Sequence, residues 1–169
     1  MANEAERPEG NSVGWKCGTC GELITRTEDG WVEWLASEDE QGATRLKGLR
    51  LVHRISASPR RQEAHGCQYD DQMEFRKDQS IVEGLPLERF VGPDGLMLLL
   101  SLIAADDMAR DEVVELTKRV QVPGYEQARE LLAEAIKRGV VVPMIGTGYY
   151  LQSEIKAILQ WALHEVQIA

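Results

Sequence analysis

The chain has 169 residues, of which 43% are hydrophobic and 28% are charged, and its formal net charge is -9. This composition excludes collagen-like, low-complexity and largely disordered proteins. The longest apolar run, Leu96–Leu100, is far shorter than the roughly 20 residues that cross a bilayer. The acidic N-terminal segment also lacks the apolar stretch of a secretory signal. We therefore expect a cytoplasmic protein without a membrane segment.

Residues 1–12 are polar and rich in Glu, Pro and Gly, which predicts a mobile tail. Residues 22–27 and 31–35 follow it and are rich in Ile, Thr, Trp and Val. They flank Asp29-Gly30, a dipeptide typical of tight hairpin turns. The sequence therefore predicts a β-hairpin across this turn.

Residues 45–56 predict a third strand, with His53 on its apolar face and Arg50 and Arg54 on the other. This strand belongs to a basic segment, residues 41–62, which contains six bases and no acid: Arg45, Lys47, Arg50, Arg54, Arg60 and Arg61. Residues 28–40 contain six acids and no base. Either the two stretches lie on neighbouring strands and neutralise each other, or the basic segment is a surface for phosphate or an acidic protein partner.

Three cysteines are available for metal binding, two of them in the sequence Cys17-Gly-Thr-Cys20. In a reducing compartment this spacing favours a metal ion over a disulfide framework. With Cys67 and the intervening strands, the segment 15–67 resembles a zinc ribbon in motif and strand order. The resemblance implies a structural zinc ion, but the second CxxC of a typical ribbon is missing, so a histidine is needed beside Cys67.

Two histidines compete for the fourth ligand position. His53 is favoured because it lies on the inward face of a strand, whereas His65 lies in a Gly-containing loop two residues before Cys67. The alternatives to a metal site are small buried thiols and a redox pair formed by Cys17 and Cys20.

Residues 70–84 are polar and acidic and predict a linker. It would separate a zinc-ribbon-like β domain, residues 13–69, from a helical domain, residues 85–169. In the latter, apolar residues at helical spacing predict helices over 95–105, 110–120 and 125–138, followed by a hairpin over 140–151 and a last helix from Ser153.

This order of elements resembles a winged-helix domain over about residues 93–166. The resemblance implies that the helix 125–138 enters the DNA major groove and that the hairpin is the wing. The contacts it implies are Tyr125, Gln127, Arg129, Lys137 and Arg138 on the helix and Thr147, Tyr149 and Tyr150 on the wing.

The predicted fold is α+β, a small zinc-stabilised antiparallel β domain followed by a mainly helical, winged-helix-like domain. We expect no enzyme, because the sequence shows no nucleophile with a base, no carboxylate pair at a strand end and no phosphate-binding loop. The first hypothesis is a DNA-binding or otherwise nucleic-acid-associated regulator of transcription or accessory factor. The alternative is a non-enzymatic protein-interaction adaptor, acidic and able to form a homodimer through its last helix. From residue 85 onward 8 bases face 12 acids, which counts against DNA.

Overall fold

Two antiparallel sheets form the first half of the chain in the computed structural model, which describes residues 14–143 and 148–168. In the smaller sheet β1 (Trp15–Lys16) pairs with β2 (Leu23–Ile24). The larger sheet has the strand order β4-β3-β5 and is built from β3 (Gly30–Glu38), β4 (Thr44–His53) and β5 (Ile81–Pro86). The mixed α+β class predicted from the sequence is confirmed. The predicted tail, residues 1–12, lies outside the described residues.

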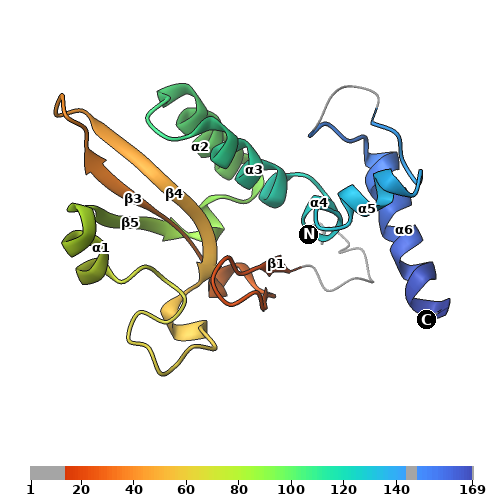
Figure 1. Cartoon of the computed structure of the whole chain (residues 1–169), viewed down its shortest axis with the longest axis horizontal. Coiled ribbons are helices and arrows are strands. Elements are labelled where there is room, and N and C mark those ends of the chain that lie inside the picture. Colours follow the sequence, from red (N-terminus) through yellow and green to blue (C-terminus); the bar gives the residue numbers. More distant parts are fainter. Residues whose placement is uncertain (1–13, 144–147, 169) are drawn as a thin grey trace, which may run out of the picture.

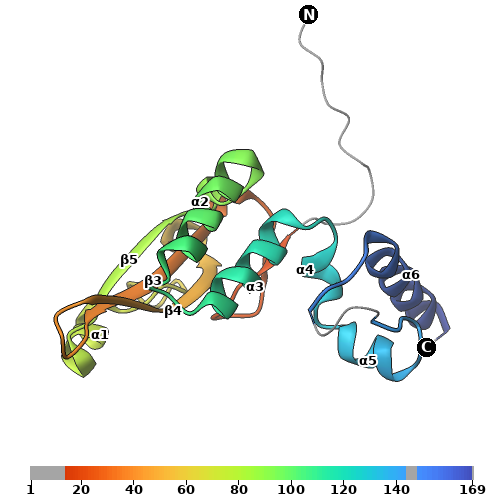
Figure 2. The same ribbon diagram turned by 90° about the horizontal axis from the view of Figure 1, so that it is seen from above.

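Helices lie on one face of the larger sheet, at one of its ends and beyond it (Figure 1, Figure 2). They are α1 (Asp71–Asp78), α2 (Gly92–Ala105), α3 (Arg110–Gln121), α4 (Tyr125–Ala128), α5 (Leu132–Lys137) and α6 (Gln152–Ile168). Short 3-10 turns cover Thr27–Asp29, Ile55–Ala57 and Leu87–Arg89. Figure 1 and Figure 2 show α2 and α3 on one face of the larger sheet and α4 to α6 at the far end of the molecule. No helix in the described part of the chain is long and apolar enough to cross a membrane.

The predicted hairpin across Asp29-Gly30 is wrong. Strand β2 pairs with β1, while β3 pairs with β4 and β5. The glycine at position 30 serves packing instead of a turn, because a Cβ atom there would lie 2.5 Å from the Leu87 side chain. Gly30 and Leu87 are far apart in the sequence, so their contact leaves no local sequence pattern.

The segment 70–84, predicted to be a linker, instead contains α1 and most of β5. The Asp70 side chain caps α1 by accepting a hydrogen bond from the Met73 amide at 2.9 Å. Strand β5 then pairs with β3 from Ala36↔Ile81 to Trp31↔Pro86. This segment is therefore an integral part of the larger sheet.

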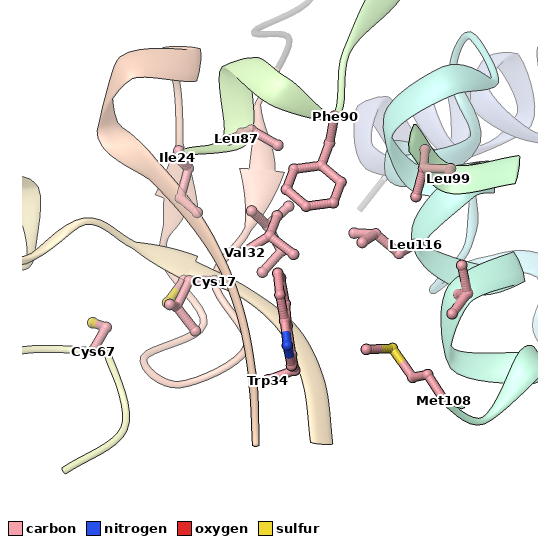
Figure 3. Close-up of a cluster of buried hydrophobic side chains, with 13 residues drawn as sticks. Cys17, Ile24, Val32, Trp34, Cys67, Leu87, Phe90, Leu99, Met108 and Leu116 are labelled. Atoms are coloured by element: carbon pink, nitrogen blue, oxygen red, sulfur yellow. The ribbon is translucent and has the colours of Figure 1, made fainter. Parts of the chain in front are cut away.

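The main hydrophobic core lies between the larger sheet and the helices α2 and α3. Val32 and Trp34 of β3 meet Phe90, Leu99 and Leu116 there (Figure 3). Residues on both sides of position 85 fill this one core, so the helices α2 and α3 pack against strands that precede position 85.

A second, smaller core joins α4, α5 and α6. It is made of Tyr125, Ala128, Ala135, Val141, Ile155 and Ile158. The helix predicted over 125–138 is interrupted, because the Leu131 amide bonds to the Ala128 carbonyl at 2.8 Å and this tighter turn separates α4 from α5. Residues 140–143 and 148–151 form no strand, and the tip of the predicted wing, residues 144–147, lies outside the described residues.

Neighbouring leucines on α2 provide a test of the main core. Leu99 is fully buried, whereas Leu100 is 50% exposed. We expect Leu99→Ala to lower the free energy of unfolding by about 2 to 5 kcal/mol, because it opens a cavity under the helix. Leu100→Ala should cost less than about 1 kcal/mol. Urea unfolding of both variants measures the difference, and equal effects would contradict this placement of α2.

Candidate metal centre

Four side chains from three separate segments converge beside the larger sheet. Cys17 and Cys20 come from the turn between β1 and β2, His53 is the last residue of β4, and Cys67 lies in the loop before α1. Their sulfur and ring nitrogen atoms all lie within 4.8 Å of one another. His53 Nδ1 is 3.5 Å from the Cys20 Sγ atom and 3.9 Å from the Cys67 Sγ atom. This group could hold a metal ion.

Backbone hydrogen bonds shape the turn that carries Cys17 and Cys20. The Cys17 amide bonds to the Glu22 carbonyl at 2.9 Å, and the Gly21 amide returns to the Cys17 carbonyl at 3.0 Å. The Gly18 amide bonds to the Leu51 carbonyl at 2.8 Å, which fastens the turn to β4. The two thiols are thus held beside the strand that supplies His53.

The loop that carries Cys67 is fixed at several points. Gly66 has a φ of +58°, and a Cβ atom there would lie 2.8 Å from Ser58, so glycine is required just before the ligand. The Ser58 hydroxyl lies 3.1 Å from the Cys67 Sγ atom, and the Thr19 hydroxyl donates to the Cys67 carbonyl at 2.6 Å. Both contacts hold the Cys67 thiol toward the other three side chains.

A buried carboxylate supports the same loop from the sheet. Glu33 of β3 is fully buried and forms a 2.7 Å ion pair with Arg50 of β4. Glu33 also accepts hydrogen bonds from the Tyr69 amide at 3.0 and 3.1 Å, and the Arg50 guanidinium stacks 3.5 Å from the centre of the Tyr69 ring. Burial raises the pKa of Glu33, although Arg50 opposes this effect. The cluster fixes the chain two residues after Cys67.

The thiols differ in how readily they ionise. Burial alone would raise the pKa of Cys17, but hydrogen bonds from the backbone amides of Cys20 and Thr19 and from His53 outweigh it and bring the pKa to about 6. Burial raises the pKa of Cys20 to about 12, and the neighbouring sulfurs of Cys17 and Cys67 reinforce this shift. Three sulfurs this close carry more than one negative charge only when a cation balances them.

His65, the other histidine considered as a ligand, lies outside this group. Its Nδ1 atom is 2.8 Å from the Gln68 carbonyl, and its Nε2 atom is 3.3 Å from Glu63. His53 is instead 5% exposed at the end of β4, on the inward face that the alternation of the strand predicts. The structure therefore brings His53, and not His65, to the cysteines.

The basic segment is largely neutralised by acids. Arg50 pairs with Glu33 across the β3–β4 ladder, and Arg45 pairs at 3.1 Å with Asp39, which lies in the turn between these strands. The interpretation that the acidic and basic stretches neutralise each other is thus confirmed for these two. The remaining pairs are Lys47 with Asp78, Arg54 with Glu88 at 3.8 Å, and Arg60 with Glu63. Arg61 is exposed and has no acidic partner in the described part of the chain.

The residues implied as DNA contacts by the winged-helix resemblance do not form one exposed face. Tyr125 is buried, and its hydroxyl lies 3.0 Å from a Glu115 carboxylate oxygen. Arg129 pairs with the buried Glu126 at 3.1 Å, and Arg138 pairs with Glu134 at 2.8 Å and with Glu165 at 3.2 Å. Lys137 and Tyr149 are exposed, Gln127 and Tyr150 are half-buried, and Thr147 lies outside the described residues.

Sequence reasoning missed the residues that support the ligands, above all Glu33 and Ser58. The signal for Glu33 was a single acid inside the apolar run of β3, because a charge in such a run is stable only with a partner. Comparison with protein-family models, with curated proteins and with solved structures found no match.

The two histidines provide a test of the ligand set. We expect His53→Ala to bind no metal and to be less stable than the unmodified chain, because it removes one of the four side chains that could hold the ion. His65→Ala should retain the metal. Elemental analysis of the purified variants by plasma mass spectrometry measures the metal per chain. Retention in His53→Ala together with loss in His65→Ala would reverse the assignment.

Proposed function

We propose that this chain is a non-enzymatic protein-interaction adaptor whose sheet half is held together by one structural zinc ion. The observation that carries the proposal is the pairing of most bases of the basic segment with acids, which leaves few bases free to bind phosphate. The adaptor hypothesis therefore takes precedence over the nucleic-acid-associated regulator and over the winged-helix mode of DNA reading.

The donor set and its spacing fit zinc. Zinc prefers thiolate and imidazole ligands in a tetrahedron, with Zn–S near 2.3 Å and Zn–N near 2.0 to 2.1 Å, so a sulfur and a nitrogen on one ion lie roughly 3.6 Å apart. The distances from His53 Nδ1 to the sulfurs of Cys20 and Cys67 are 3.5 and 3.9 Å. Only small adjustments of these side chains would complete the tetrahedron.

The site favours a structural role for the zinc ion. Cys17, His53 and Cys67 are buried, and four protein ligands fill a tetrahedron without an open position for water or substrate. The role of such an ion is to supply folding free energy, which is largest for a sheet with few other contacts. This supports a zinc-dependent fold rather than zinc-dependent chemistry.

The surface offers apolar groups for protein contact. Several large apolar side chains are more than half exposed, namely Met73, Phe75, Ile81, Met97, Val142 and Leu163. Of these, Phe75 and Ile81 lie together, since both line the same two hollows, and exposed apolar side chains that lie together are typical of protein-binding surfaces. Self-association through α6 stays a proposal, supported by the exposed Leu163 on that helix.

Ion pairing of the basic segment can be tested at Asp78. Hydrogen bonds from Lys47 first, and from Ser80, hold the pKa of Asp78 at about 2. Because a lowered carboxyl pKa stabilises the folded state above the unfolded pKa, this contribution is lost as the pH falls from about 3.8 toward 2. We expect Lys47→Met to raise the pKa of Asp78 toward 3.8 in a carbon-13 NMR titration of the carboxyl group. Arg61→Met, the control, should leave it unchanged, and an unchanged pKa in Lys47→Met would contradict the pairing.

Binding to duplex DNA separates the adaptor from the regulator. We expect a dissociation constant weaker than about 0.1 mM at physiological salt, beyond the usual range of non-specific DNA binding. A double variant, Glu63→Gln with Glu88→Gln, frees Arg60 and Arg54 and should bind detectably at low salt. Fluorescence anisotropy with a labelled duplex over a salt series measures both proteins. Tight, salt-dependent binding of the unmodified chain to the duplex would contradict the adaptor proposal and favour the nucleic-acid-associated regulator.

A further inference from the structure

Strand β5 forms a free edge of the larger sheet. It pairs with β3 on one side, and no strand in residues 14–143 and 148–168 pairs with its other side. None of its six residues is buried. An open strand edge presents unpaired backbone N–H and C=O groups, which are a template for another strand.

Two hollows flank the N-terminal end of this edge. One has a volume of about 340 Å³ and is lined by residues that include Ala36, Thr44, Phe75 and Ile81. The other has a volume of about 320 Å³ and is lined by Asp71, Gln72, Phe75, Ser80, Ile81 and Val82. Phe75 and Ile81 line both hollows and are 57% and 60% exposed. They therefore form an apolar ridge with room for a side chain on either side.

The ionisable residues that line the hollows are all acids, namely Glu38, Asp71 and Asp78, and no base lines either hollow among the described residues. Glu83, on β5 itself, adds a fourth acid, and its carboxylate accepts a hydrogen bond from the Trp34 indole at 2.9 Å. Asp78 is balanced by Lys47, so the excess comes from the other three. Lysine or arginine on an incoming segment would complement it.

We infer that the edge of β5 binds an extended segment of another protein as a fourth strand of the sheet, and that this segment alternates apolar residues with lysine or arginine. The inference rests on the proposed adaptor function and names its partner class. Apolar side chains of the segment enter the hollows beside Phe75 and Ile81, because successive side chains of a strand point to opposite faces. The basic side chains face the acids of the rim.

A second copy of this chain does not fit the same edge. It would bring the same acids to the same place, on a chain with a net charge of -9. Like charges set against each other across an interface are costly and select against a partner. The occupant is therefore a segment of opposite charge.

A library of random dodecapeptides displayed on phage tests the inference on the full, metal-loaded chain. We expect the enriched peptides to alternate apolar and basic residues. Ile81→Lys should weaken the binding of a selected synthetic peptide by about tenfold or more, as loss of a central apolar contact does. Phe75→Ala is the second variant at the ridge. Leu163→Lys is the control, because Leu163 is 56% exposed and lies on α6 at the other end of the molecule (Figure 1).

The peptide backbone gives an independent readout. Methylation of alternate amide nitrogens on the peptide edge that faces β5 should abolish binding, since it removes the donors of the strand ladder while keeping the side chains. Peptides that bind Ile81→Lys and Phe75→Ala as tightly as the unmodified chain, that tolerate this methylation, or that are acidic would overturn the inference. The first of these results would leave the adaptor function standing on another surface. Absence of any enriched peptide also overturns the inference. The adaptor function is contradicted by a different result, namely tight, salt-dependent binding of the unmodified chain to duplex DNA.

Discussion

The convergence of three thiols and one imidazole is the constraint that brings the turn of the smaller sheet, the end of β4 and the loop of Cys67 together. The two strands of the smaller sheet have only two residues each and the turn between them carries two of the four ligands, so this sheet has little stability of its own. Without a cation, burial and the neighbouring sulfurs of Cys17 and Cys67 oppose the ionisation of Cys20, whose pKa is raised. A bound metal ion would turn this unfavourable proximity into the strongest set of contacts between the turn, β4 and the loop of Cys67.

The buried Glu33 extends that constraint into the larger sheet. Water does not reach the Glu33 carboxylate, so its hydrogen bonds must come from Arg50 and Tyr69, and these bonds hold both residues in place. Arg50 also reaches the Cys67 carbonyl at 3.5 Å. Arg50, which the sequence suggested as a phosphate-binding residue, thus holds the loop that carries Cys67. Arg50 is therefore not free to bind phosphate, and Arg45, Lys47, Arg54 and Arg60 pair with acids at the surface.

The sequence predicted the parts of the structure that local chemistry determines. The spacing of Cys17 and Cys20, the inward side of the β4 alternation at His53 and the helical periodicity of α2 and α3 all correspond to what is observed. Features that depend on distant contacts were missed. In the sequence Gly30 resembles a turn residue, and only the structure shows the Leu87 side chain packed against it. Strand β5 has no long apolar run, because an edge strand buries neither face fully. No glycine or proline marks the break between α4 and α5 in the sequence.

A second buried carboxylate, that of Glu126, connects the helical end of the molecule to the backbone next to Cys17. Glu126 of α4 forms a 2.6 Å ion pair with Arg119 of α3 and accepts a hydrogen bond from the Lys16 amide at 2.8 Å. Arg119 also donates to the Lys16 carbonyl at 2.8 Å. Lys16 directly precedes Cys17, so the backbone that positions a metal ligand is the same backbone that satisfies Glu126. Loss of order at Cys17 would remove the Lys16 amide from Glu126, which costs about 1.5 to 3 kcal/mol for a hydrogen bond to a charged group, while Arg119 and Arg129 would still pair with the carboxylate. The helical end therefore supports the backbone next to Cys17, although it contributes no residue to the group that could hold a metal ion.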